Sequence, residues 1–198
     1  MSPLLESIQI REGLMQNMSY HEERMSLSSL ALYGTKVNFS LGSLILPLNA
    51  REGIVKCRII YRNVVDKIEF QPYLPKEVNS LKLVFSDNIA YKYKFEDRSG
   101  LLGLLKQKES ADDILIVKQG RITDTSFSNV VFRKGANYLT PSTCLLNGTR
   151  RQQLLNEGLI KEMDMSVEDI SRMDSCILIN AMLDLKSENE IKISSIIF

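Results

Sequence analysis

The stretch that most constrains the fold of this chain runs from Asp113 to Phe132 and reads DILIVKQGRITDTSFSNVVF. Its two ends are rich in β-branched and aliphatic residues, and KQG is typical of a hairpin turn. The pattern therefore predicts strands at Asp113 to Lys118 and at Arg121 to Phe132. The centre of the second strand is unusual, because TDTSFSN gathers a carboxylate, hydroxyls and an amide. Asp124 is therefore either a turn or edge-strand residue bonded to nearby hydroxyls, or a functional carboxylate.

The rest of the chain alternates between short strand patterns and helix patterns. It starts as a hairpin, Leu4 to Ile10 and Leu14 to Asn17, with Glu12-Gly13 as the turn. A helix follows from Ser19 to Leu32, in which Ser19 would be the N-cap, Glu22 its capping-box partner and Gly34 the terminator. Further strands are expected at Gly53 to Tyr61, Lys67 to Pro72, Leu81 to Phe85, Tyr138 to Thr140 and Ser175 to Asn180, and helices at Arg150 to Gly158 and Ser166 to Met173.

One stretch of the sequence reads as a linker between domains. It contains Pro72, Pro75 and the polar run KEVNS. We therefore expect a small N-terminal domain at residues 1–75 and a larger domain at residues 76–198. Together with the mixture of strand and helix patterns, this division predicts an α+β protein.

Composition excludes several classes of protein. The 198 residues are 44% hydrophobic and 25% charged, which is enough to bury a core, and the net charge is only +1. Without a long basic run, nucleic acid or an anionic membrane is not expected as the main partner. The three cysteines are odd in number and lie far apart in apolar runs, which favours buried thiols in a reducing compartment. No signal peptide or transmembrane pattern is present, so a cytoplasmic protein is expected.

Six segments together resemble a known family. They are LLESIQIREG, YHEER, YKYKFEDR, DDILIVKQGRITDTSFSNVVF, YLTPSTCLLNGTRRQQLL and CILINAML. Their order and spacing are similar to those of the class IV aminotransferases, the fold-type IV enzymes that use pyridoxal phosphate (PLP). The resemblance implies a two-domain fold like that of D-amino acid aminotransferase, with a small α/β domain and a larger pseudo-barrel-like domain. It also implies PLP in the cleft between the domains, a homodimer and no metal.

The resemblance gives Asp124 a role. In this family the carboxylate of the motif like TDTSFSN pairs with the protonated pyridine nitrogen, which keeps the ring cationic and able to accept electrons. The family usually has Glu at this position, so Asp124 is one methylene shorter. Asn129, at the end of the same motif, is also assigned to cofactor binding.

YKYKFEDR would supply the lysine that forms the Schiff base with PLP. A lysine beside a cationic ring has a lowered pKa, which favours the reactive neutral amine. Lys94 lies four residues before Arg98, as in the family motif. If the segment is extended, Lys92 shares a face with Lys94 and stays an alternative. Without the resemblance, both would be read as exposed lysines of a strand.

The phosphate of PLP would be held by an arginine and by backbone N–H groups at a helix start, where the donors converge. The resemblance assigns this role to Arg24, in the H-x-x-R of YHEER, and to Gly148, Thr149, Asn180 and Ala181. A salt bridge at Arg24 and an ordinary helix N-terminus at Asn147-Gly148-Thr149 are the structural alternatives.

Substrate contacts are predicted for Arg58, Tyr61 and Tyr73, on strands that face the cofactor in the family, although their pattern fits core and surface equally well. His21 is the single histidine, but the lysine released by substrate moves the proton in this family. We therefore assign His21 to support of Arg24.

The closest resemblance is to aminodeoxychorismate lyase, which forms 4-aminobenzoate and pyruvate for folate biosynthesis. Branched-chain or D-amino acid aminotransferase is the alternative, because both reactions begin with the same removal of an α-proton from an amino acid-like substrate. The family pattern also includes an N-terminal hairpin that precedes the first residues of this sequence, so a more open pocket is expected. Because of this departure and of Asp124 in place of Glu, a noncatalytic relative that keeps the fold stays a second hypothesis.

Overall fold

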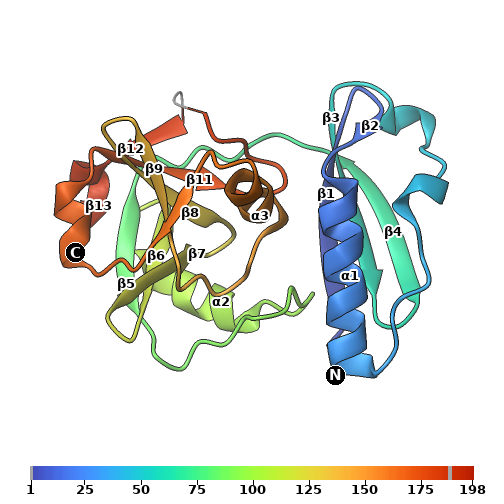
Figure 1. Ribbon diagram of the computed structural model, residues 1–198, viewed down its shortest axis with the longest axis horizontal. Helices are drawn as coiled ribbons and strands as arrows, with labels where there is room; N and C mark the ends of the chain where they lie inside the picture. Colours follow the sequence, from blue (N-terminus) through green and yellow to red (C-terminus); the bar gives the residue numbers. More distant parts are fainter. Residues whose placement is uncertain (1, 187–188) are drawn as a thin grey trace. The chain divides into compact units, whose positions relative to one another are not determined.

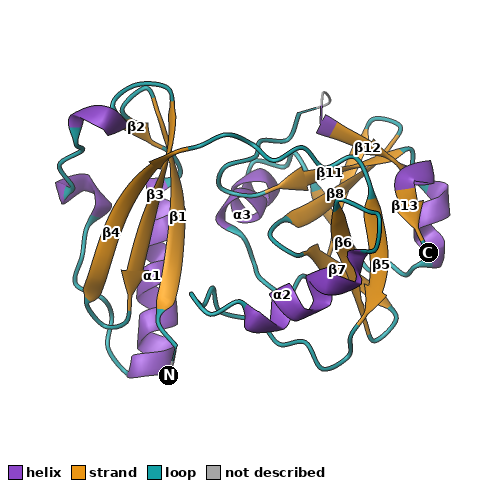
Figure 2. Ribbon diagram, turned by 180° about the vertical axis from the view of Figure 1, so that it is seen from behind, coloured by secondary structure: helices purple, strands orange, loops and turns teal. Residues whose placement is uncertain are grey.

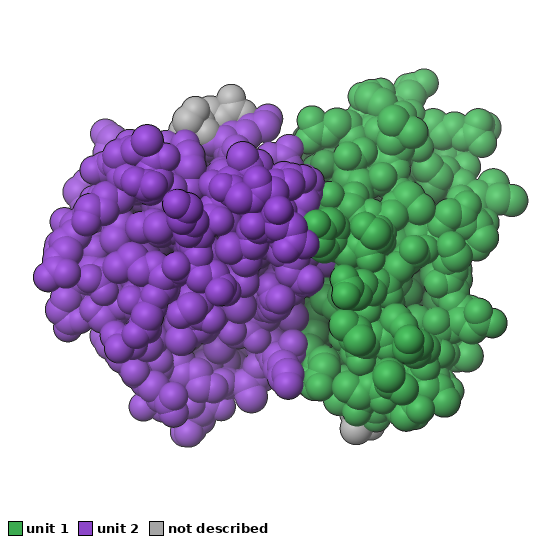
Figure 3. All heavy atoms as spheres, viewed as in Figure 1, with its two compact units in different colours: residues 1–75, 93–97 green, residues 76–92, 98–198 purple. Residues whose placement is uncertain are grey.

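The structure, a computed structural model, describes residues 2–186 and 189–198. The chain forms two compact units (Figure 3), which we describe separately. Unit 1 consists of Met1–Pro75 and Tyr93–Asp97, and unit 2 of Lys76–Lys92 and Arg98–Phe198. The chain passes from unit 1 to unit 2 after Pro75 and returns to unit 1 for Tyr93–Asp97, a segment that the predicted division assigned to the larger domain. Lys94 therefore belongs to unit 1.

Unit 1 is a sheet with a helix against one face (Figures 1 and 2). The strand order is β2-β1-β3-β4, and β1 pairs antiparallel with both β2 and β3. Side chains from helix α1 and from one face of β1 and β3 form its core, including Met25, Ile8 and Ile59. Each such buried aliphatic side chain contributes about 1.5–3 kcal/mol. The elements are β1 (Leu4–Arg11), β2 (Leu14–Met15), α1 (Met18–Tyr33), β3 (Ile54–Tyr61) and β4 (Val65–Pro72), with 3-10 helices η1 (Leu41–Ser43) and η2 (Leu48–Ala50).

Local backbone geometry explains the first hairpin and the end of α1. Glu12 and Gly13 have φ values of 48° and 75°, the left-handed pair that a two-residue hairpin turn requires. Gly34 has φ 78° and donates its N–H to the Leu30 carbonyl, so it ends α1 as predicted. The predicted capping box is wrong. Asn17 precedes the helix without a side-chain cap, and Glu22 instead accepts hydrogen bonds from Ser40 and Leu41.

Unit 2 is dominated by a mixed sheet in the order β10-β9-β8-β7-β6-β5-β13, with β11 pairing with β8 and β12. Strand β6 is buried along nearly its whole length and pairs parallel with β5, which explains its continuous apolar sequence. The strands are β5 (Leu81–Phe85), β6 (Asp113–Lys118), β7 (Arg121–Thr125), β8 (Asn129–Lys134), β9 (Asn137–Pro141), β10 (Lys161–Met163), β11 (Ser175–Ile179), β12 (Glu190–Lys192) and β13 (Ile196–Ile197).

The predicted strand from Arg121 to Phe132 is in fact two strands. β7 and β8 pair antiparallel, with Asp124 opposite Asn129, and a turn joins them. The Thr125 hydroxyl accepts the Ser128 N–H at 3.0 Å, and the Thr125 N–H donates to the Ser128 carbonyl at 2.9 Å. Side-chain capping of the backbone by threonine thus reverses the chain where the β-branched pattern suggested continuity.

The helices of unit 2 are short. They are α2 (Ser99–Leu105), α3 (Thr149–Asn156), and 3-10 helices including η3 (Lys106–Lys108), η4 (Glu168–Arg172) and η6 (Ile193–Ser195). The helix expected at Ser166 to Met173 is only the 3-10 turn η4, where Asp169 accepts bonds from Ser166 and so favours a tight turn. Helix α2 was not predicted, because its glycine-rich sequence has a weak helix propensity. No helix in the described ranges has the length and apolar character needed to cross a membrane.

Gly34 provides a stability test of unit 1. Replacing it with Ala places a Cβ in the left-handed region, and we expect a loss of about 1–2 kcal/mol in the free energy of unfolding. Gly34→Asn is the matched control, and its loss should be smaller, because Asn tolerates this conformation better than Ala. Urea unfolding followed by far-UV circular dichroism measures both. Equal losses in the two variants would mean that the backbone conformation of residue 34 does not limit stability.

Candidate active site

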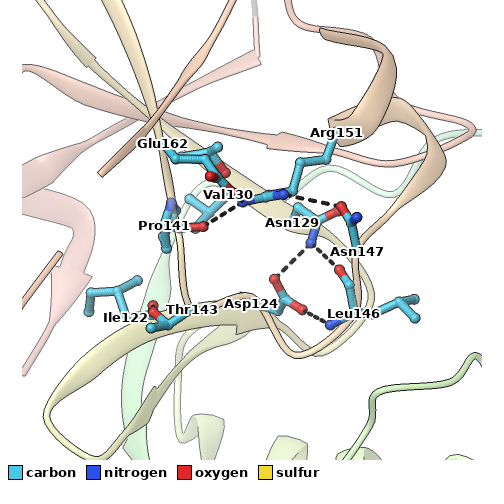
Figure 4. Close-up of polar contacts among 11 residues, drawn as sticks. Ile122, Asp124, Asn129, Val130, Pro141, Thr143, Leu146, Asn147, Arg151 and Glu162 are labelled. Atoms are coloured by element: carbon cyan, nitrogen blue, oxygen red, sulfur yellow. Dashed lines mark hydrogen bonds and ion pairs between the residues drawn. The ribbon is translucent and has the colours of Figure 1, made fainter. Parts of the chain in front are cut away.

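Asp124 is the centre of a buried hydrogen-bond network in unit 2 (Figure 4). One carboxylate oxygen accepts the Asn129 side-chain N–H at 2.8 Å, and the other accepts the Leu146 backbone N–H at 2.9 Å. Asn129 also donates to the Leu146 carbonyl at 2.8 Å. The network therefore joins β7 and β8 to the loop before α3.

The hydroxyl groups of TDTSFSN form hydrogen bonds with groups other than the Asp124 carboxylate. Thr123 donates to the Ile116 carbonyl of β6, and Thr125 caps the β7–β8 turn. Ser126 interacts with Asp113, and Ser128 accepts the Asn180 side-chain N–H at 2.8 Å. The interpretation of Asp124 as a turn residue bonded to nearby hydroxyls is therefore wrong. Its hydrogen-bond donors in the described residues are amides.

Burial raises the pKa of Asp124 from an ordinary value of 3.8 to about 6. The N–H groups of Leu146 and Asn129 and the charge of Arg151 act in the opposite direction and lower it. A buried carboxylate whose direct donors are neutral is poorly compensated. A cationic N–H donor placed beside it would lower its pKa and be stabilised in turn.

Gly148 must lack a side chain for this network to form. A Cβ at position 148 would lie 2.2 Å from the Asn129 Oδ1, far inside any allowed contact. The next residue, Thr149, begins α3 and is buried, so its hydroxyl lies at the helix start as predicted. The start of α3, with Gly148 and Thr149, thus lies next to Asn129 and its partner Asp124.

Asn180 belongs to the same region of unit 2. Its side chain donates to Ser128 and accepts the N–H groups of Met182 and Leu183 at 2.8 and 3.1 Å. These bonds close a tight turn that contains Ala181, directly after β11. The six predicted cofactor residues of unit 2 therefore lie at strand ends, in turns and at the start of α3, and hydrogen bonds link Asp124 to Asn129 and Asn180 to the β7–β8 turn.

In unit 1, Arg24 pairs with a buried carboxylate that the sequence analysis did not single out. Its Nε and Nη2 atoms lie 2.8 and 2.6 Å from the two oxygens of Glu6 on β1. Burial would raise the pKa of Glu6, but the charge of Arg24 and hydrogen bonds from His21 and Arg24 lower it to about 2. This bidentate ion pair fixes the direction of the guanidinium. Arg24 is therefore in a buried ion pair, which differs from the surface salt bridge considered above.

His21 completes this cluster. Its Nδ1 lies 2.7 Å from Glu6, and burial lowers its pKa, assisted by the charges of Arg24 and Lys94. The ring is thus neutral at neutral pH, and Nδ1 carries the proton because ionised Glu6 is an acceptor. The predicted supporting role of His21 for Arg24 is exerted through Glu6.

Lys94 is held beside this cluster by its backbone. Its carbonyl accepts the Leu5 N–H at 2.8 Å, and Leu4 and Phe95 form an isolated bridge, so the segment lies along β1. Lys92 and Lys94 do not lie on one strand, because this stretch is irregular. Arg98, four residues further on, donates to the Ser126 carbonyl in the β7–β8 turn.

The three predicted substrate residues do not share one face of the unit 1 sheet. Tyr61 is 1% exposed and packs in the core with Cys57 and Ile59, and burial raises its pKa. Arg58 alternates with these residues and lies on the opposite face, 3.7 Å from Glu69. Tyr73 is partly buried, with the Lys56 ammonium 5.7 Å from its ring centre.

Comparison with known proteins identifies the family of this chain. Residues 100–187 match the amino-transferase class IV family. An uncharacterized protein from Haemophilus influenzae is 38% identical over 92% of this chain and 98% of its own. A crystal structure described as a "putative 4-amino-4-deoxychorismate lyase" from Haemophilus somnus is 40% identical, with a TM-score of 0.85 over 93% of this chain and 98% of its own.

A more distant structure, a "hypothetical aminotransferase" from Mycobacterium tuberculosis in a PLP-bound form, has a TM-score of 0.79 over 98% of this chain and 81% of its own, at 14% identity. The fold is the mixed α and β fold of the fold-type IV aminotransferases. The chain belongs to the class IV aminotransferase family.

Asp124 predicts a distinctive pH dependence of stability. Its folded-state pKa is raised, so it binds a proton more tightly when folded, and its contribution to stability is lost as pH rises from 3.8 through about 6. The free energy of unfolding of the cofactor-free protein, minus that of Asp124→Asn, should fall by up to about 3 kcal/mol between pH 4 and pH 7. Urea unfolding across this range measures the difference.

Asp112→Asn is the matched control. Hydrogen bonds from Asn79 and Ser80 lower the pKa of Asp112, so its contribution is present at neutral pH and lost as pH falls. The difference for this variant should therefore change with the opposite sign, and the change should lie mainly below about pH 4, as pH falls through the ordinary value of 3.8. If the difference in unfolding free energy between the parent and Asp124→Asn did not change with pH, burial would not raise the pKa of Asp124.

Proposed function

We propose that this protein is a PLP-dependent enzyme that cleaves 4-amino-4-deoxychorismate to 4-aminobenzoate and pyruvate. The observation that carries the proposal is the buried Asp124 carboxylate, oriented by Asn129 and Leu146 and bonded to neutral donors. Such a group suits the cationic ring nitrogen of the cofactor. The choice of a lyase is supported by the 40% identical relative described as a "putative" enzyme of this kind.

Bound PLP supplies a protonated pyridine ring that accepts the electrons released from the substrate. In this proposal Asp124 keeps the ring nitrogen protonated. The Nζ atom of Lys94 would hold the cofactor and would be the base that takes up the α-proton of the substrate. Arg24 would hold the phosphate, together with N–H and side-chain donors of Gly148, Thr149, Asn180 and Ala181.

An amino acid aminotransferase is the second candidate, because the family includes this activity and a distant relative with the same fold is described as an aminotransferase. Substrate contacts remain proposed for Arg58 and Tyr73, whereas the core position of Tyr61 favours an indirect role. We also propose a cytoplasmic homodimer. The three cysteines are free thiols, which suits a reducing compartment.

Trapping the cofactor tests the lysine. Protein incubated with PLP should show a visible absorbance band, and borohydride reduction should attach the cofactor to the peptide that contains Lys94. Lys94→Ala should abolish the attachment, whereas Lys92→Ala should retain it, and mass spectrometry distinguishes the two. Attachment at another lysine would refute Lys94, and a protein that takes up no PLP would support the noncatalytic relative.

Product analysis tests the reaction. With 4-amino-4-deoxychorismate, the PLP-loaded protein should release 4-aminobenzoate and pyruvate in equal amounts, and Lys94→Ala should release neither. L- and D-amino acids with 2-oxoglutarate or pyruvate as acceptors should give no sustained keto-acid formation. Steady transamination without 4-aminobenzoate would reject the lyase and leave the PLP enzyme in place.

A further inference from the structure

Arg151 is a buried guanidinium to which neither the sequence analysis nor the proposed function gives a role. Its side chain on α3 is 3% exposed, and it donates to the Pro141 carbonyl at 2.9 Å, the Asn147 side chain at 3.1 Å and Glu162 at 2.6 Å (Figure 4). Its acidic partner, Glu162, is 52% exposed, so water weakens that pairing. Its Nε atom is buried without a hydrogen bond among the described residues. Burying the Arg151 guanidinium is costly, and these three contacts do not by themselves explain why the charge is buried.

The Asp124 carboxylate offers an explanation for the buried charge of Arg151. Its direct donors are amides, and Arg151 is the cationic side chain whose charge acts on it. The connection is also structural, because Arg151 binds Asn147, the residue next to Leu146, whose N–H donates to Asp124. Arg151 therefore acts on Asp124 both through its charge and through the loop that orients the carboxylate.

Among the causes that shift the pKa of Asp124, the positive charge is that of Arg151, whereas the guanidinium of Arg98, before α2, binds the Ser126 carbonyl. On β6, Asp113 faces Ser126 and is itself acidic. In the loop after β9, the charges of Asp124 and Glu162 help burial to raise the pKa of Cys144 to about 11, so it stays a neutral thiol. On β10, Glu162 is negative, and on β8 Asn129 is neutral. Across these elements of unit 2, Arg151 on α3 is the group that can offset the buried carboxylate.

We propose that Arg151 is a positioning residue that keeps Asp124 ionised and correctly oriented before any cofactor binds. Asp124 is then ready to receive a cationic N–H donor, without first having to lose a proton at neutral pH. The consequence for catalysis rests on the proposed function, but the ionisation of Asp124 is a property of the protein alone.

The test is a pH titration of the cofactor-free protein with ¹³C-labelled aspartate carboxylates, followed by NMR, with Asp124→Asn used to assign the signal. In the parent, Asp124 should titrate near the raised value of about 6. Arg151→Gln should move the midpoint upward by about one pH unit or more, because an opposite charge has been removed. Arg151→Lys, which keeps the charge but loses the planar fork, should show less than half of that shift.

Glu162→Gln is the matched control and does not depend on the folding of the Arg151 variants. It removes the exposed partner of Arg151 but leaves the guanidinium, so the midpoint of Asp124 should stay unchanged or fall. A rise in Glu162→Gln, or an unchanged midpoint in a folded Arg151→Gln, would overturn the proposal. Equal shifts in the Gln and Lys variants would also overturn it, because they would mean that Arg151 only tethers α3. A failure of PLP to bind would refute the proposed function without changing any of these titrations.

Discussion

The hydrogen bonds that Asp124 accepts organise the candidate site of unit 2. They connect the end of β7, the start of β8 and the loop before α3, and they require a glycine at position 148 because Asn129 occupies the space of its side chain. Arg151 orders the same loop from the other side through Asn147. Loss of one of these contacts would therefore disturb several elements at once.

Two buried carboxylates show how local charge decides ionisation in this protein. Glu6 and Asp124 are both buried, yet the pKa of Glu6 is lowered to about 2 and that of Asp124 is raised to about 6. Glu6 makes a bidentate ion pair with Arg24, whereas the direct donors of Asp124 are neutral. Glu6 is thus ionised at neutral pH, and its ion pair orients the Arg24 guanidinium. Among the residues that the structure describes, Asp124 has no such contact, and it is suited to acquire one from a ligand.

The resemblance to class IV aminotransferases led to Asp124, Asn129, Gly148, Thr149, Asn180 and Ala181 from the sequence, and the structure joins them in one connected region. It did not lead to Glu6 or Arg151. Both carry charge, and charged residues are usually exposed, so their sequence positions alone suggested solvent. A signal existed for Glu6, because it lies within the buried strand pattern LLESIQI, where an unpaired carboxylate would be costly. Arg151 follows Arg150 at a helix start, and nothing local separates the buried arginine from its neighbour.

The sequence by itself determined most strands, the hairpin turns at Glu12-Gly13 and Gln119-Gly120, and the end of α1 at Gly34, because these depend on alternation and on left-handed backbone conformations. Only the tertiary structure decided that Arg121 to Phe132 is two strands and that Tyr61 lies in the core away from Arg58. It also decided which carboxylate has a cation beside it. Strand pairing, burial and the distance between charges depend on residues far apart in the chain, and local sequence patterns do not contain that information.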